Sequence, residues 1–350
     1  MTKYQAPSTD DRRIWDLWQS HNYQGAIVGA DDAGIFAALV EAPGSAQELA
    51  GRLGYDVRAT GVLLRLLAGL DLIVPRGGKY QLTDEARLYL VKTSPFYWGN
   101  MMRIGVDQWT RERIIARLKE NGSHEAAGPE GTPAVSQEGR PADGWAAGKI
   151  SIEQAHVIAA GMHSHSLPAA IGAARNYDFA GINKILDVGG GSGCFMIAMA
   201  QAHPALRCTI MELNTMCEVA SSYIKSGEVG AQVDTVAVDM FREPWPKGYD
   251  AVFFSNVWHD WNFRTCRWLA KQAFDILPSG GRIMLHEMLL DDGDTGPATP
   301  AAFSMQMLLG TQGQQFTFME LKTILETVGY RDIETLATCG YYSITTGYKR

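Results

Sequence analysis

The sequence predicts an α/β protein in which a doubly wound, mainly parallel sheet follows an α-helical domain. From Lys184 onward, short apolar segments alternate with helical ones, the pattern of a parallel sheet covered by helices on both faces. The first of these segments runs into the glycine-rich turn at 189–193. The chain closes with two β-rich runs, at 330–338 and 341–349, joined only by Cys339 and Gly340. These runs predict a terminal antiparallel hairpin.

The first hundred residues read as short helices followed by a small hairpin. Ser45 and Glu48 form a capping-box pattern that predicts the start of a helix, and Gly54 predicts its end. Leucines repeat at helical spacing over 56–73. Two extended pieces around Gly77 and Gly78 then predict the wing of a winged helix.

A winged helix raises the question of DNA binding. The helix expected at 56–73 offers only Arg58 and Arg65 as cations, and the chain's net charge is −7. A helix that binds in a DNA groove normally carries several phosphate or base contacts. The sequence therefore favours a dimerisation surface over DNA binding.

Size and composition predict two main domains and a connector. The chain has 350 residues, of which 46% are hydrophobic, enough for more than one core. We expect a winged-helix-like dimerisation domain at 1–100, a helical connector at 101–181 with a loose loop near 120–149, and a catalytic domain at 182–350. Neither a signal peptide nor a membrane-spanning run is evident, which predicts a soluble cytoplasmic protein. The five cysteines show no C-x-x-C pair and are expected to be free thiols.

The predicted sheet begins at 184–189 and continues with strands at 207–213, 233–239, 249–256 and 280–289. Glycines follow the first strand in the order G-x-G-x-G, at 189, 191 and 193, where a dinucleotide site would have G-x-G-x-x-G. The loop alone leaves NAD and S-adenosylmethionine open. The terminal hairpin is typical of the class I methyltransferase fold, a Rossmann-like sheet, and favours S-adenosylmethionine.

Acidic residues after the next strands suit this cofactor. Glu212 lies 25 residues after Asp187 and can accept hydrogen bonds from both ribose hydroxyls; the weaker alternative is an acidic residue at a helix N-terminus. After the third strand, Asp239 offers a carboxylate for an adenine amino group, and Met240 and Phe241 stand beside it.

A histidine follows the fourth strand, at the edge where open α/β sheets bind ligands. A histidine, whose reference pKa is ~6.5, can accept a proton from a hydroxyl, and His259 is the residue at this position. Glu287, on the fifth strand, can hold one tautomer of its imidazole. Asp260 is a further catalytic candidate, with the cap of the next helix as the alternative.

These motifs together resemble the small-molecule methyltransferases related to plant caffeate O-methyltransferases and their bacterial relatives. The matching residues are LDVGGGSG at 186–193, Glu212, 239–241, the run MHSHS at 162–166, and 259–261 with Glu287. The resemblance implies a homodimer that uses S-adenosylmethionine. From the net charge and the lack of a long apolar run we expect no nucleic acid or membrane partner, and we predict no resident metal. The cofactor residues that the resemblance implies, with those named above, are Asp187, Gly189, Gly191, Glu212, Asp239, Met240, Phe241, Ser166 and Ser255.

Two departures from the plant pattern leave the acceptor atom open. Gln315 stands where those enzymes have a second glutamate, and Ser255 replaces a lysine. The tyrosine pair at 341–342 resembles bacterial branches that methylate the β-carbon of α-keto acids or the sulfur of 4-methylthio-2-hydroxybutyrate, the latter in dimethylsulfoniopropionate synthesis. Carbon methylation could use a metal on His259, Asp260 and His286, but neighbours on a strand face opposite sides, so His286 and Glu287 cannot both face the site. A thioether needs neither base nor metal.

We therefore predict methylation of a small carboxylic acid, with the thioether as the leading substrate and a hydroxyl or an α-keto acid as alternatives. A sulfonium product calls for soft and aromatic surface, for which the candidates are Phe96, Tyr97, Trp98, Met162, Trp258, Met305 and Met307. Arg103, Arg111 or Arg140 could bind the substrate carboxylate. The predicted substrate residues are Met162, His163, Trp258, Tyr97, Arg103 and Gln306.

Overall fold

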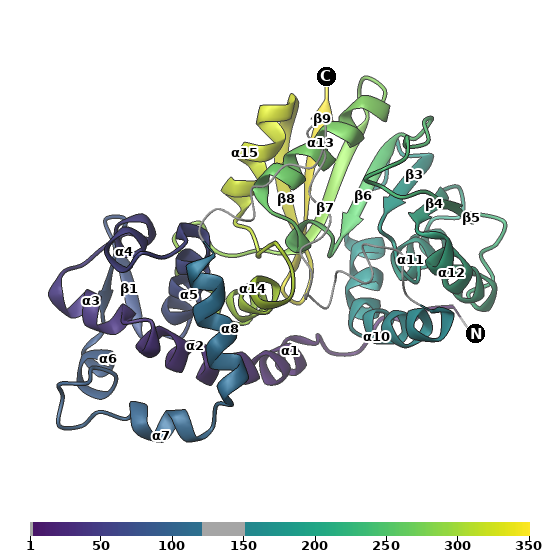
Figure 1. Ribbon diagram of the computed structural model, residues 1–350. Coiled ribbons are helices and arrows are strands. Elements are labelled where there is room, and N and C mark those ends of the chain that lie inside the picture. Colours follow the sequence, from purple (N-terminus) through teal and green to yellow (C-terminus); the bar gives the residue numbers. More distant parts are fainter. Residues whose placement is uncertain (1–2, 121–150) are drawn as a thin grey trace. The chain divides into compact units, whose positions relative to one another are not determined.

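The computed structural model describes residues 3–120 and 151–350. Their contacts divide the chain into two compact units, each built from separate segments. The sheet unit comprises 3–12, 151–288 and 318–350, and the helical unit comprises 13–120 and 289–317 (Figure 1). This division differs from the predicted one, because 289–317 belongs with the amino-terminal helices and the first residues belong with the sheet. Apart from Glu120, the predicted loop at 120–149 lies outside the described residues.

The helical unit is built around one buried helix. Its elements are α1 (Arg12–Gln19), α2 (His21–Asp32), α3 (Ile35–Glu41), α4 (Ala46–Leu53), α5 (Val57–Gly69), β1 (Ile73–Arg76), β2 (Lys79–Leu82), α6 (Asp84–Tyr89), α7 (Gly99–Ile104), α8 (Gln108–Lys119) and α14 (Ala298–Gly310). The leucines of α5 are fully buried, and α14 packs against α5. Because α14 completes this core, its segment joins a unit that is distant from it in sequence.

Local signals in the helical unit form as predicted. Ser45 and Glu48 make a complete capping box at the start of α4, and Gly54 ends it at φ 70°. Strands β1 and β2 pair antiparallel. The turn between them places Gly77 and Gly78 at φ 58° and 77°, backbone angles that favour glycine. The predicted hairpin is confirmed.

Both arginines of α5 are engaged within the helical unit. Arg58 donates to the carbonyl oxygen of Gly313 at 2.7 Å, and Arg65 donates to the Asp294 carboxylate at 2.8 Å. Both cations therefore stabilise the unit itself.

The sheet unit holds one seven-stranded sheet in the order β5-β4-β3-β6-β7-β9-β8. Strands β3 to β7 run parallel, while β9 is antiparallel to both β7 and β8. The predicted doubly wound sheet with a terminal hairpin is confirmed. The bounds are α10 (Ile152–Asn176), β3 (Lys184–Val188), α11 (Cys194–Ala202), β4 (Arg207–Glu212), α12 (Asn214–Ser226), β5 (Val233–Ala237), β6 (Ala251–Ser255), α13 (Phe263–Ile276), β7 (Arg282–Met288), α15 (Phe318–Val328), β8 (Tyr330–Cys339) and β9 (Tyr342–Lys349), with a short 3-10 turn at Trp258–Asp260.

Helices cover both faces of this sheet. Helix α10 packs on α11, α12 and β8, and α13 packs against α15; Figure 1 shows the two groups on opposite faces. The chain leaves β3 toward β4 and β5 and later returns to β6 on the other side of β3. Open α/β sheets bind ligands at such a reversal, beyond the carboxyl ends of the strands.

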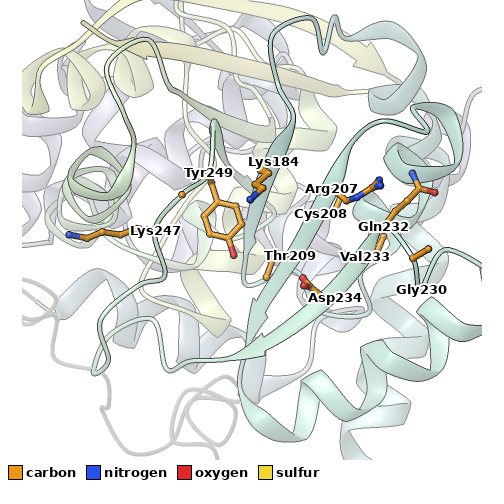
Figure 2. Close-up of a pocket in the computed structure, with 12 residues that line it drawn as sticks. Lys184, Arg207, Cys208, Thr209, Gly230, Gln232, Val233, Asp234, Lys247 and Tyr249 are labelled. Carbon is orange, nitrogen blue, oxygen red and sulfur yellow. The ribbon is translucent and has the colours of Figure 1, made fainter.

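A hollow of about 350 Å³ lies at the opposite edge of the sheet (Figure 2). Lys184, Arg207 and Val233, which line it, are the first residues of β3, β4 and β5. It is therefore separate from the ligand-binding edge. Among the described residues, no helix has the length and apolar character needed to cross a membrane.

Candidate active site

The glycine-rich loop joins β3 to α11 through three left-handed residues. Gly189, Gly191 and Gly193 have φ of 71°, 55° and 76°, angles that other residues adopt only at a cost. At Gly193 an added Cβ would also lie 2.4 Å from Ile210 Cδ1, whereas at Gly191 it would meet nothing within 4 Å. All three glycines of the predicted G-x-G-x-G pattern are therefore required by their positive φ, and the middle one, Gly191, also has free space beside its Cα.

Glu212 lies beside this loop at the end of β4. Its carboxylate accepts from the backbone N–H of Leu213 at 2.7 Å and of Gly191 at 3.3 Å. Burial raises its pKa to about 7 against these two donors, which lower it. The sequence-based alternative, an acidic residue on a helix N-terminus, agrees with the Leu213 contact, but the Gly191 contact joins Glu212 to the loop.

Asp187 is the second buried acid near the loop. Its side chain is 1% exposed, and Oδ2 has no hydrogen-bond partner among the described residues. Burial raises the pKa of Asp187, and the charge of Glu212 raises it further. Two desolvated acids at this edge suit a ligand that brings hydroxyl and ammonium donors.

The predicted adenine-binding residues form a turn after β5. Asp239 accepts from the N–H of Phe241 at 2.9 Å, and the Met240 carbonyl accepts from the Trp245 indole at 2.8 Å. The Phe241 ring packs edge-on against Trp261 with centroids 4.7 Å apart. The turn is therefore fixed by its own side chains.

His259 and Glu287 meet as the sequence predicts. His259 Nδ1 lies 2.8 Å from Glu287 Oε2, and Glu287 Oε1 accepts from the backbone N–H of Val257 and Trp258 at 3.2 and 3.1 Å. The carboxylate therefore binds an Nδ1–H tautomer, which puts the imidazole lone pair on Nε2. Burial lowers the pKa of His259, but the charge and hydrogen bond of Glu287 outweigh this effect, so the pKa is raised.

Asp260 and His286 do not complete a metal site with His259. Asp260 Oδ1 lies 3.9 Å from His259 Nε2, and the cap of α13 is Asn262, which accepts from Thr265 N at 2.9 Å. The alternative of Asp260 as helix cap is therefore wrong. His286 is fully buried and contacts other side chains: the hydroxyls of Ser255 at 3.1 Å and Thr338 at 3.0 Å, and the ring of Tyr342 at 4.9 Å. Within the described ranges, no three His, Cys, Asp or Glu side chains are arranged to hold a metal ion.

The MHSHS run lies on α10, in the same unit. Met162 is 53% exposed and contacts the His165 ring through its sulfur at 3.4 Å, while Ser166 is buried. His163, predicted to bind substrate, instead lies 2.9 Å from Ser192 of the glycine-rich loop. Sequence reasoning missed His165, whose pKa is lowered to about 4 by burial and by the charge of His259, so that its imidazole is neutral near pH 7. The signal for it was its place in this run.

Other predicted substrate residues have structural partners. Arg103 binds Asp31 and Asp32, the latter at 2.7 Å, and Tyr97 donates to Asp31. Arg111 also binds Asp32, at 2.7 Å. The structure thus commits both arginines to a pair of acids at the end of α2, because burying those acids requires cations. Arg140 lies outside the described residues.

The remaining candidates divide between core and surface. Met305 and Met307 are buried in the helical unit, and Gln306 accepts from Gln19 at 3.2 Å. Trp258 is fully buried beside Phe254, and its backbone N–H donates a hydrogen bond to the Glu287 carboxylate. Phe96 and Trp98 are 59% and 56% exposed. For Met305 and Met307, apolar packing explains the residue type without a substrate, whereas the buried indole N–H of Trp258 has no hydrogen-bond partner among the described residues.

Comparison with known proteins places this geometry in a family. An O-methyltransferase domain model matches residues 135–331, and an O-methyltransferase dimerisation domain model matches 15–92. The chain belongs to the O-methyltransferase family. As a member, it is an S-adenosylmethionine-dependent methyltransferase.

Individual relatives cover the whole chain. The 3-hydroxy-5-methyl-1-naphthoate 3-O-methyltransferase of Streptomyces sahachiroi is 32% identical over 95% of this chain and 92% of its own. Bovine acetylserotonin O-methyltransferase is 26% identical over 92% and 93%. Among solved structures, an O-methyltransferase family 2 protein from Planctomyces limnophilus, in complex with apigenin, matches with a TM-score of 0.84 at 24% identity over both full chains, which supports the fold.

The residues at the carboxyl edge fit S-adenosylmethionine. The loop approaches a ligand with backbone at Gly191, where no side chain intervenes, and Glu212 and Asp187 offer buried carboxylate oxygens for ribose hydroxyls and an amino group. The cofactor supplies an activated methyl group. Asp187, Glu212 and the backbone of the glycine-rich loop are the groups that would hold it.

Proposed function

We propose that this O-methyltransferase methylates a hydroxyl group on a small aromatic molecule, with His259 as the general base. The observation that carries the proposal is the contact between His259 Nδ1 and Glu287 Oε2 at 2.8 Å. A histidine fixed in the Nδ1–H tautomer accepts a proton at Nε2, and the carboxylate stabilises the imidazolium that forms. The acceptor O–H bond would break and its proton would move to Nε2, while the oxygen forms the new bond to the methyl carbon as the methyl–sulfur bond breaks and S-adenosylhomocysteine leaves.

The electrostatics of the dyad favour a hydroxyl over a thioether. A sulfur lone pair needs no base, so S-methylation of 4-methylthio-2-hydroxybutyrate, the leading prediction from the sequence, would leave the His259–Glu287 pair without a chemical role. The raised pKa of His259 brings the base closer to the pKa of a phenol and makes proton transfer in the transition state more favourable. The carbon-acceptor alternative needs an enolate, which a metal on His259, Asp260 and His286 was expected to stabilise, but His286 contacts the hydroxyls of Ser255 and Thr338 instead.

The relatives support the same acceptor. The Streptomyces enzyme is named for a hydroxyl on a naphthoate, and acetylserotonin O-methyltransferase for an indole derivative. We extend to this chain the shared chemistry, an aromatic hydroxyl. Arg103 and Arg111 are engaged by Asp31 and Asp32, so we propose no substrate carboxylate for them.

Product analysis by mass spectrometry tests the proposal. The full chain is incubated with S-adenosylmethionine and hydroxynaphthoates, other phenols, 4-methylthio-2-hydroxybutyrate and α-keto acids, with and without chelator. We expect a methyl ether that forms equally in both buffers. A sulfonium product with the phenols unchanged would overturn the proposal, as would a carbon-methylated acid that disappears with chelator.

A base variant separates chemistry from binding. We expect His259→Ala to lower kcat by at least ~10²-fold while S-adenosylhomocysteine still binds. His156→Ala is the matched control, because His156 is exposed on α10 and should keep full activity. A His259→Ala enzyme with near-normal kcat would argue against proton transfer.

A further inference from the structure

The amino-terminal segment 3–12 is fixed to the sheet unit at two points. The backbone N–H of Tyr4 donates to Gln201 of α11 at 2.7 Å. At the other end, Arg12 donates to the Gly340 carbonyl at 2.9 Å, in the turn between β8 and β9. This turn lies at the ligand-binding edge, because β9 begins opposite Met288, the last residue of β7. Figure 1 shows the segment running from the N-terminus beside α10.

One imidazole links this segment to the glycine-rich loop. His163 Nδ1 lies 2.9 Å from Ser192 Oγ, and Ser192 is 4% exposed between Gly191 and Gly193. The His163 ring stacks on Tyr223 of α12, with centroids 4.5 Å apart and planes 23° apart. Tyr4 closes the other side edge-on at 6.2 Å, with its hydroxyl 3.5 Å from Nε2. The Ser192 bond is the strong contact of the set; the Tyr4 hydroxyl contact is long.

The protonation states agree with a neutral hydrogen-bonded chain. Burial lowers the pKa of His163, and burial with the nearby Cys194 and Tyr223 raises the pKa of Tyr4 to about 12. Both side chains are therefore neutral, and in the tautomer with hydrogen on Nδ1 the imidazole donates to Ser192 Oγ and accepts from the Tyr4 hydroxyl at Nε2. In that tautomer the Ser192 oxygen accepts from His163, and its own hydrogen can be donated to the Cys194 thiol.

We propose that His163 is a positioning residue for S-adenosylmethionine: it holds Ser192, and through it the glycine-rich loop, in the conformation that binds the cofactor, with Tyr223 and Tyr4 as its supports. The loop contains three glycines at positive φ, so its unbound conformational freedom is large. A hydrogen bond from the rigid α10 to the middle of the loop reduces that freedom before the ligand arrives. The inference uses the family's cofactor and is independent of the acceptor atom.

Calorimetric binding of S-adenosylhomocysteine, with no acceptor present, is the direct test. We expect His163→Leu and Ser192→Ala each to raise Kd about tenfold, the size of one lost hydrogen bond. Because both remove the same contact, the double variant should bind about as well as either single one. His163→Gln keeps a donor near Ser192 and should recover part of the affinity.

Steady-state kinetics then distinguish positioning from substrate binding. KM for S-adenosylmethionine should rise in His163→Leu, while kcat and KM for the acceptor stay near wild type. A rise confined to the acceptor KM would overturn the proposal and return His163 to the substrate site, as would additive effects in the double variant or unchanged binding in Ser192→Ala. If His163→Leu does not fold, the Kd of Ser192→Ala for S-adenosylhomocysteine tests the proposal, because that variant removes only one hydroxyl.

The control stands on the same helix. His156 is exposed on α10, and His156→Leu should bind S-adenosylhomocysteine as wild type does. An equal loss of affinity in this variant would assign the effect to α10 in general and would contradict a specific role for His163.

Discussion

At the residue scale, burial shifts the pKa values of Glu212 and His259 in opposite directions. It favours the neutral form of Glu212 and raises its pKa to about 7, whereas it favours the neutral form of His259 and would lower that pKa. Glu287 reverses the sign at His259 by supplying a negative charge 2.8 Å away. The pKa shifts of Glu212 and His259 each have a measurable consequence.

The pH dependence of kcat should report on the Glu287 charge. The base must be neutral to accept a proton, and the pKa of His259 is raised above 6.5, so kcat should rise with pH above the ordinary histidine range. In Glu287→Gln the counter-charge is gone and burial prevails, so the rising limb should move to lower pH while the maximal kcat falls about tenfold or more. Rate profiles of both enzymes check this; an unmoved limb would contradict it.

The buried carboxylate of Glu212 should lower the free energy of unfolding and strengthen cofactor binding. Its pKa is raised from 4.5 to about 7 in the folded chain, so its burial is without penalty below pH 4.5 and reduces the free energy of unfolding as pH rises toward 7. Glu212→Gln should therefore stabilise the protein by roughly 1–3 kcal/mol at about pH 8 and little at about pH 5, and weaken S-adenosylhomocysteine binding at least tenfold, by about 1.4 kcal/mol. Denaturant titrations of both proteins at each pH measure this difference in stability. Equal stabilisation at the two pH values would contradict the raised pKa of Glu212.

At the element scale, the junction of β3 and α11 concentrates the glycine requirement. Gly193 begins α11 in the left-handed region and faces Ile210 of β4, while Gly191 faces open space. The same residue type thus serves two purposes within a few positions, close packing at one and ligand approach at the other.

Replacing Gly191 or Gly193 with alanine should distinguish the position needed for ligand approach from the one needed for close packing. Both variants place a Cβ at positive φ, at a cost of about 1–2 kcal/mol, but only Gly193→Ala adds a clash, with Ile210 Cδ1 at 2.4 Å, worth about 1–3 kcal/mol more. Gly193→Ala should therefore show the larger drop in Tm, and Gly191→Ala the larger loss of cofactor affinity relative to its change in Tm. Equal losses of Tm would count against this account of the loop.

At the scale of the whole molecule, the chain carries a dimerisation domain and leaves apolar side chains exposed on it. Ile14 and Leu17, on one face of α1, are 68% and 56% exposed, and the dimerisation model begins within α1. Exposed apolar residues that cluster on one helix indicate an interaction surface.

Charge on this face should weaken association. We expect wild type to sediment as a dimer and the variant Ile14→Asp with Leu17→Asp to sediment as a monomer, because burying the two new carboxylates at an interface is costly. Val157→Asp is the control, as Val157 is 75% exposed on α10 in the sheet unit. A double variant that remains dimeric would place the interface elsewhere.

Local patterns were enough to predict the elements of the fold and part of the site. Strand positions, the hairpins, the capping box of α4 and the glycine-rich loop follow from periodicity and from residues that fix the backbone locally. The pairing of His259 with Glu287 was also predictable, because the carboxyl ends of parallel strands meet at one edge and alternation along β7 turns His286 away from it.

The sequence by itself therefore determined the fold class, the edge of the sheet where the candidate site lies and the pairing of His259 with Glu287, since each depends on backbone rules or on residues near a strand end. Only the tertiary structure decided the partners of side chains from different elements: His163 with Ser192, Arg103 with Asp31 and Asp32, and Met305 with the core of the helical unit. It also decided that 289–317 belongs with helices far earlier in the chain. Such contacts depend on how whole elements pack, and the residue types involved are equally compatible with a binding site, a surface or a core.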